Sequence, residues 1–87
     1  MPDVTIEFYG IPRERAGRAE LTVQAATVAD ALAAVQRHCP AWDDLRRDGR
    51  LAPHYRLSVD GQRFVTEMSE RLTAGTRLLL LSADAGG

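Results

Sequence analysis

Apolar and polar residues alternate in three stretches of the chain, residues 4–9, 19–23 and 55–59. Successive side chains of a β-strand point to opposite faces of the sheet, so this alternation predicts strands with one buried face. Gly10 and Pro12 end the first stretch, and the charged segment 13–18 is predicted to be a turn or loop. The first two strands then form an N-terminal hairpin.

A helical periodicity follows these strands. Apolar side chains recur at spacings of four, three and four residues, which places them on one stripe of a helix. The stripe consists of Val28, Leu32, Val35 and Cys39. Thr27 stands at the N-cap position, and Pro40 ends the helix. We expect one further helical turn over residues 42–47.

The last third of the chain returns to strand signals. Asp60-Gly61 predicts a hairpin turn that leads from the third strand into a short strand over residues 62–65. Residues 77–82 are predicted to be the last strand, and they include four consecutive leucines. A strand that is apolar on both faces belongs in the middle of a sheet.

The direction of the four leucines predicts a binding surface. Leu78 and Leu80 point to one face of the sheet, and Leu79 and Leu81 point to the other. A single helix covers only one face, so the second pair is expected to form an exposed apolar patch that binds a partner together with Tyr9. The alternative is that Tyr9 and arginine side chains simply cover the pair.

The order of the elements is strand, strand, helix, strand, short strand, strand, which is an α+β arrangement. With the last strand placed between the first and third, the fold is a β-grasp (ubiquitin-like) fold, a mixed sheet of four to five strands packed on one main helix. We expect a β-grasp domain over residues 1–82. Residues 83–87 are expected to be a flexible tail, because they are too small to pack and can reach about 17 Å when extended.

The composition narrows the classes of function. The chain has 87 residues, 45% of them hydrophobic and 26% charged, which fits one globular domain and not a disordered chain. A net charge of −1 favours neither nucleic acid nor an anionic membrane as a partner. The sequence shows no signal peptide or membrane-spanning run, and its single cysteine fits a reducing cytoplasm. All eleven basic residues are arginine, so the chain offers no lysine for acylation.

Other chemistry-bearing residues have structural interpretations. Cys39 lies on the helical stripe, which favours a buried thiol over a nucleophile. His38 and His54 stand without ligands at metal-binding spacing, so no metal site is expected. The neighbours Asp43 and Asp44 are expected to be solvated. The same holds for the arginines of the charged segment, which are Arg13, Arg15 and Arg18.

The predicted strand order and a set of short motifs together resemble the MoaD/ThiS family of ubiquitin-like sulfur carriers. The motifs are the charged segment 13–17, Val59-Asp60-Gly61, Leu72-x-x-Gly75 and the terminal Gly86-Gly87. The resemblance covers essentially the whole chain and is closest to the small subunit of molybdopterin synthase. One departure is Ser82-Ala83-Asp84-Ala85, which replaces the proline-containing approach to Gly-Gly that is common in those subunits.

The resemblance implies a mechanism. An ATP-dependent adenylyltransferase related to ubiquitin-activating enzymes would adenylate the Gly87 carboxylate, and a sulfur nucleophile would then displace AMP to leave a thiocarboxylate. Ala85 and Gly86 would thread the partner's active site, for which glycine is suited because it lacks Cβ. The chain would be a carrier co-substrate and not an enzyme. It would bind no cofactor or metal itself, and the activating partner would use the ATP.

Three functions stay open at this point. The first is a carrier that donates sulfur to a synthase, with the large subunit of molybdopterin synthase as the leading partner and thiamine, cysteine or a specialised metabolite as other destinations. The second is a protein modifier that is conjugated through Gly87 to target lysines, which needs the same activation step. The third is a β-grasp interaction module whose tail is inert.

Overall fold

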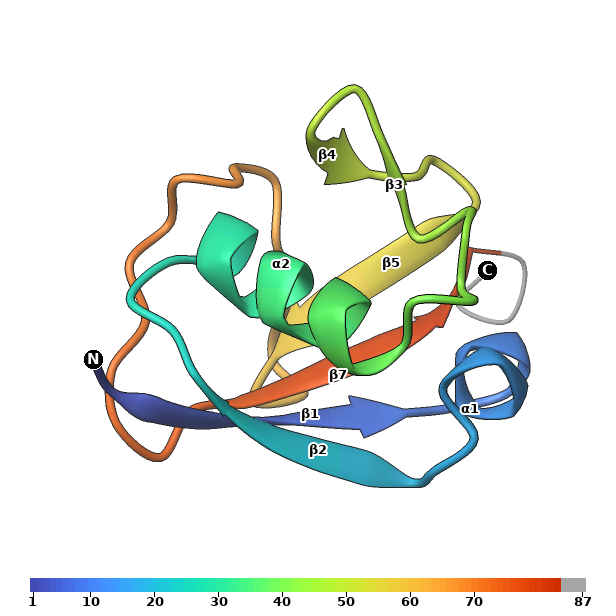
Figure 1. Ribbon diagram of the computed structural model, residues 1–87. Helices are drawn as coiled ribbons and strands as arrows, with labels where there is room; N and C mark the ends of the chain where they lie inside the picture. The colour runs from blue at the N-terminus through green and yellow to red at the C-terminus, as the bar shows by residue number, and fades with distance from the viewer. Residues whose placement is uncertain (84–87) are drawn as a thin grey trace.

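A five-stranded mixed sheet forms the frame of the protein in the computed structural model, which describes residues 1–83 (Figure 1). The strand order is β2-β1-β7-β5-β6. These strands span Glu20–Gln24, Asp3–Phe8, Arg77–Ser82, Tyr55–Val59 and Arg63–Phe64, respectively. Helix α2, Val28–His38, crosses one face of this sheet. The remaining elements are the short helix α1, Ile11–Ala16, and a small hairpin of β3, Arg46–Arg47, and β4, Arg50–Leu51.

The pairing of the strands confirms the predicted β-grasp topology. Strand β7 lies in the middle of the sheet, parallel to β1 and antiparallel to β5. Strand β1 also pairs with β2 in the expected N-terminal hairpin, with Ile6 opposite Leu21. Because β1 and β7 run in the same direction, the N-terminus lies at the opposite end of the sheet from the end of β7 (Figure 1).

The core lies between the sheet and α2. Leu78 and Leu80 of β7 are fully buried there, together with Leu32 and Val35 of the helix. Trp42 closes one end of the core, where its ring meets the ring of Phe8 edge-on at 6.0 Å between centroids. A second edge-on contact, at 5.6 Å, joins Trp42 to Tyr55.

Helix α2 begins and ends as its sequence predicts. The Thr27 hydroxyl accepts a hydrogen bond from the Asp30 N–H at 3.2 Å, so it caps the helix. At the other end, the Cys39 N–H donates to the Val35 carbonyl at 2.9 Å, and Pro40 follows. The Cys39 thiol is buried, as expected.

The charged segment 13–18 was predicted to be a loop, and this prediction is wrong for most of its length. Residues 11–16 form α1, with Pro12 in the first turn, where the missing N–H of proline costs nothing. Gly17 ends the helix in the left-handed conformation, φ +71°, and its N–H donates to the Arg13 carbonyl at 3.0 Å.

The segment after α2 also differs from the prediction. A helical turn was expected over residues 42–47, but residues 43–44 form a turn and residues 46–51 form the β3–β4 hairpin. The reason is the Asp48-Gly49 pair, whose positive φ angles of 54° and 74° suit a tight hairpin turn. Trp42 and Leu45 are nevertheless buried, as their apolar character implies.

The second predicted hairpin is confirmed. Asp60 and Gly61 have positive φ angles of 52° and 71°, and they connect β5 to the short strand β6. Asp60 also ties this hairpin to β7, because its carboxylate accepts the Arg77 N–H at 2.9 Å. Among residues 1–83, no helix combines the length and the apolar character needed to cross a membrane.

Candidate functional site

The predicted partner-binding residues lie together around one hollow on the sheet face opposite α2. The hollow has a volume of about 280 Å³ and is lined by Tyr9, Gly10, Leu79 and Leu81; we refer to it as the docking hollow. Leu79 and Leu81 are half-buried, and Tyr9 is 44% exposed. Gly10 has a φ of +61°, which a residue with a side chain adopts at a cost, so this turn of the rim favours glycine.

Polar contacts hold the Tyr9 side chain at the rim of the docking hollow. Its hydroxyl donates to the Glu7 carboxylate, which also accepts from the Arg77 guanidinium. Arg77 reaches across to Glu20 as well, at 2.8 Å. The hydrogen bonds from Tyr9 and Arg77 lower the pKa of Glu7, and the bond to Glu7 raises the pKa of Tyr9. Glu7 is therefore charged and Tyr9 neutral near pH 7, the states that this arrangement requires.

One exposed aromatic residue of the same sheet face was missed at the sequence level. Phe64 is 43% exposed, and the Arg56 guanidinium lies 5.0 Å from the centre of its ring. Ser58 pairs with both Phe64 and Leu79, so the three side chains share one row across the sheet. The alternation of β5 together with the Asp60-Gly61 turn could have revealed this row.

A second hollow lies beside the end of β7. It has a volume of about 470 Å³, and we refer to it as the polar hollow. Its lining consists of Gly10, Ile11, Arg15, Asp44, His54, Tyr55 and Ser82. Gly10 belongs to both hollows, so the two adjoin at the place where the chain leaves the sheet. Ile11, 51% exposed, stands on the other side of Gly10 from Tyr9.

Asp44 is the centre of the polar hollow. One of its carboxylate oxygens accepts the Tyr55 hydroxyl at 3.0 Å, and the other lies 3.1 Å from Nε2 of His54. The Arg15 guanidinium approaches the second oxygen to 3.5 Å. Burial raises the pKa of Asp44, but the hydrogen bonds from Tyr55 and His54 and the charge of Arg15 outweigh it, so the pKa is lowered. The expectation that Asp44 is merely solvated is therefore wrong, and His54 has a carboxylate partner that its position in the sequence did not reveal.

The polar cluster continues into the core and to the end of β7. The indole N–H of Trp42 donates to the Tyr55 hydroxyl at 3.3 Å. On the other side, the Ala83 N–H donates to the backbone carbonyl of His54 at 2.9 Å. Three of the predicted site residues, Ala85, Gly86 and Gly87, lie outside the described residues.

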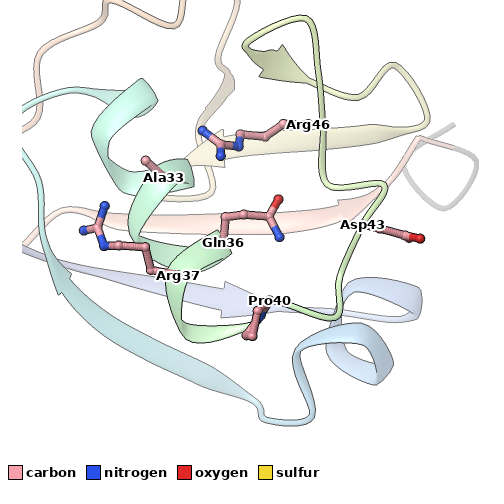
Figure 2. Close-up of a pocket in the computed structure, with 6 residues that line it drawn as sticks. All are labelled: Ala33, Gln36, Arg37, Pro40, Asp43 and Arg46. Carbon is pink, nitrogen blue, oxygen red and sulfur yellow. The ribbon is translucent and has the colours of Figure 1, made fainter.

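A third hollow, on the helix side of the molecule, contains none of the predicted site residues (Figure 2). It has a volume of about 480 Å³, and its lining consists of Ala33, Gln36, Arg37, Pro40, Asp43 and Arg46. The Gln36 amide donates to the carbonyls of Cys39 at 3.2 Å and Trp42 at 2.7 Å, so it fixes the chain after α2. Asp43 points away from the other labelled side chains (Figure 2).

The described part of the chain, residues 1–83, holds no group of three or more His, Cys, Asp or Glu side chains arranged for a metal ion. The candidate site therefore consists of the apolar docking hollow and the adjoining polar hollow, both at the end of β7. Such a surface can bind a partner and can fix the direction in which the chain continues.

Comparison with solved structures shows the same fold along the whole chain. Small archaeal modifier protein 1 of Haloferax volcanii matches with a TM-score of 0.81 and 28% identity, covering 98% of this chain and 99% of that chain. A chain of the BexX/CysO complex of Amycolatopsis orientalis matches with a TM-score of 0.78 and 25% identity, over 97% of this chain and 99% of that chain.

The fold alone is shared with molybdopterin converting factor subunit 1 of Pyrococcus furiosus. That structure matches with a TM-score of 0.73 and 17% identity, over 94% of this chain and 98% of that chain. No protein-family model and no curated protein sequence matches the chain. The strand order, the helix across one face and these likenesses show that the chain has the β-grasp fold of ubiquitin-like small proteins of the MoaD/ThiS family, the family that its sequence resembles.

Proposed function

We propose that the protein is a sulfur carrier whose Gly87 carboxylate is activated by a partner enzyme. The observation that carries the proposal is the position of the docking hollow. Leu79 and Leu81 line it on the same strand that leads to Gly86-Gly87, so a partner bound there stands next to the segment that it must receive. The likeness to small carrier and modifier proteins supports the same role.

The chemistry would take place in two steps on the partner. A carboxylate oxygen of Gly87 attacks the α-phosphorus of ATP, pyrophosphate leaves, and an acyl adenylate forms. Hydrosulfide (HS⁻) from the sulfur donor then attacks the carbonyl carbon, AMP leaves, the S–H proton is lost to water, and the product is a thiocarboxylate. Adenylation is needed because a carboxylate oxygen is a poor leaving group, whereas AMP is a good one. The protein supplies the docking surface and the reacting carboxylate, and the adenylyltransferase supplies the catalytic groups.

The destination of the sulfur is a further part of the proposal. We place molybdopterin synthesis first, as the sequence resemblance suggests, with thiamine, cysteine or a specialised metabolite as the other destinations. The Pyrococcus furiosus protein is named as a molybdopterin converting factor subunit, and the Amycolatopsis orientalis structure is of a complex of CysO with BexX. A cytoplasmic pathway fits a chain with one buried, unpaired cysteine.

Intact mass spectrometry tests the carrier function directly. The full chain is incubated with an adenylyltransferase related to ubiquitin-activating enzymes, ATP and a sulfur donor. We expect a mass increase equal to the exchange of one oxygen for one sulfur, located by fragmentation at Gly87. A chain without Gly87 and a chain extended by one residue beyond Gly87 are the matched controls, and neither should change. Adenylation without any sulfur product would exclude the carrier function.

A protein modifier is the second candidate, because the Haloferax volcanii structure is that of a protein named as a modifier. The same mixture, supplemented with lysine-containing acceptor proteins, separates the two functions. Amide adducts between Gly87 and acceptor lysines, with no thiocarboxylate on the free chain, would favour the modifier. If the chain without Gly87 kept full function in the cell, an interaction module with an inert tail would replace both candidates.

A further inference from the structure

We propose that Asp44 is a positioning residue for the C-terminal segment. By holding His54 in place, its carboxylate fixes the backbone carbonyl that receives the Ala83 N–H, and so it sets the direction in which the chain leaves the sheet. The functional part of this inference rests on the proposed delivery of Gly87 to a partner. The structural part stands without it.

The first step is the hydrogen bond that ends the ordered pairing. Within the β5–β7 ladder, Tyr55 is the partner of Ser82. The contact beyond this pair is the 2.9 Å hydrogen bond from the Ala83 N–H to the His54 carbonyl. His54 precedes β5, so its carbonyl is not held by membership of a strand. Its position depends on what anchors the residue.

The second step is that Asp44 anchors two consecutive residues. Its two oxygens bind the His54 ring and the Tyr55 hydroxyl, at 3.1 Å and 3.0 Å. The two rings also pack against each other, with centroids 4.2 Å apart. Arg15 of α1 contacts the same carboxylate at 3.5 Å. The His54 backbone is thereby tied through its side chain to two other parts of the fold.

The third step concerns the size of the effect. The side chains of Asp44, His54 and Arg15 are 38%, 47% and 45% exposed, so each contact adds little to the stability of the whole protein. A carboxylate that binds several groups at once does restrict where those groups can lie. The expected result of losing it is therefore local movement at His54 and Ala83 and not unfolding.

The direction set at Ala83 matters because the proposed reacting residue is close to it in sequence. Gly87 is four residues beyond Ala83, and a chain of that length can span at most about 14 Å. A segment of this length reaches only the region near Ala83, so a change in the direction of the chain at Ala83 also changes where Gly87 can lie. Fixing Ala83 therefore favours delivery of Gly87 to a partner seated on the adjoining docking hollow.

Amide hydrogen exchange measured by NMR on the isolated full chain tests the structural part. In Asp44→Ala we expect the Ala83 amide to exchange about tenfold faster or more than in the unsubstituted protein. The Tyr9 amide, which donates to the Leu80 carbonyl at 3.0 Å, reports on the rest of the sheet and should keep its rate. Asp43→Ala is the matched control, because Asp43 lies next in sequence but points into a different region (Figure 2).

The outcomes are distinct. An unchanged Ala83 rate in Asp44→Ala would overturn the proposal, and so would equal acceleration at Ala83 and Tyr9, which indicates general destabilisation. Asp44→Asn keeps an acceptor for Tyr55 but loses the charge toward His54 and Arg15. The exchange rate of its Ala83 amide should therefore lie between the rates in the unsubstituted protein and in Asp44→Ala. This variant also serves if Asp44→Ala does not fold.

The functional part is read from the kinetics of adenylation. With the activating enzyme and ATP, Asp44→Ala should lower kcat several-fold while KM for the carrier stays near its original value. The reason is that the substitution leaves the docking hollow intact but no longer fixes the direction of the chain at Ala83. An unchanged kcat with faster Ala83 exchange would reject the role in delivery. Failure of Gly87 to be activated in any variant would reject the proposed function and leave the exchange result untouched.

Discussion

The four consecutive leucines of β7 differ only in direction, and direction alone decides what each one does. Leu78 and Leu80 are fully buried beneath α2, where each contributes about 2 kcal/mol of hydrophobic stabilisation. Leu79 and Leu81 are half-buried on the opposite face and line the docking hollow. Substitutions of the first pair should therefore act on stability, and substitutions of the second pair should act on binding.

We predict that Leu81→Ser weakens the complex with the proposed activating enzyme by about tenfold or more, because it removes apolar surface from the docking hollow. Isothermal titration calorimetry measures the change. Leu21→Ser is the matched control, since Leu21 is a half-buried leucine of β2 whose partner Ile6 faces the core. Equal weakening by both variants would contradict a specific role of the docking hollow.

The sequence predicts residues on a periodic element better than residues that meet from different elements. Alternation along β7 was sufficient to assign Leu79 and Leu81 to one face and to pair them with Tyr9. The cluster around Asp44 could not be predicted in this way. His54 lies ten residues further along the chain and Arg15 comes from α1, so only the folded topology brings them to one carboxylate.

Among the elements, α1 shows why short helices escape prediction. Six residues are too few for an apolar stripe to repeat, and the segment between Pro12 and Gly17 is mostly charged. Only the residues at its ends indicate a helix, because proline stands in the first turn and glycine follows the last turn. Helix α2 was predictable because eleven residues allow a stripe to repeat and Thr27 marks its start.

We predict that Gly17→Ala lowers the free energy of unfolding by about 1 kcal/mol, because alanine is strained in the left-handed conformation that ends α1. A Cβ at this position meets nothing within 4 Å, so the cost comes from the backbone and not from a clash. Urea unfolding measures the loss. Gly17→Asn should lose less, since asparagine tolerates this conformation, and an equal loss in both variants would point to another cause.

At the scale of the whole molecule, the apolar character of both faces of β7 was enough to place that strand in the middle of the sheet. The observed strand order follows from this placement. The same arrangement brings the docking hollow and the polar hollow to one end of the sheet, where they share Gly10. The region where β7 ends therefore combines an apolar hollow with a polar one.

The stability of the whole protein should depend on pH through its paired carboxylates. The pKa values of Glu7, Asp44 and Glu70 are all lowered in the folded state. For such groups the stabilisation is present above the unfolded pKa, about 4, and is lost as the pH falls through the lower folded value. We therefore predict that the protein becomes less stable as the pH falls from neutral to about 3.

Comparison with Asp44→Asn shows how much of the pH dependence of stability comes from Asp44. The variant should be slightly less stable than the unsubstituted protein at neutral pH, because the contacts of Asp44 are partly exposed, and the small difference between their urea midpoints should shrink as Asp44 becomes protonated in acid. Asp43→Asn is the control, and its midpoint should follow that of the unsubstituted protein. A difference that stays constant from neutral to acidic pH would show that charge on Asp44 is not the cause.

The length and direction of β7 have a practical consequence for attaching the protein to a surface. The exposed turn at Ala74-Gly75 leads into the start of β7, so it stands one six-residue strand, about 20 Å, from Ala83. The only native thiol, Cys39, is buried. A cysteine placed at Ala74 would thus offer a single accessible anchoring point, and molecules immobilised through it would present the end of β7 to the solution.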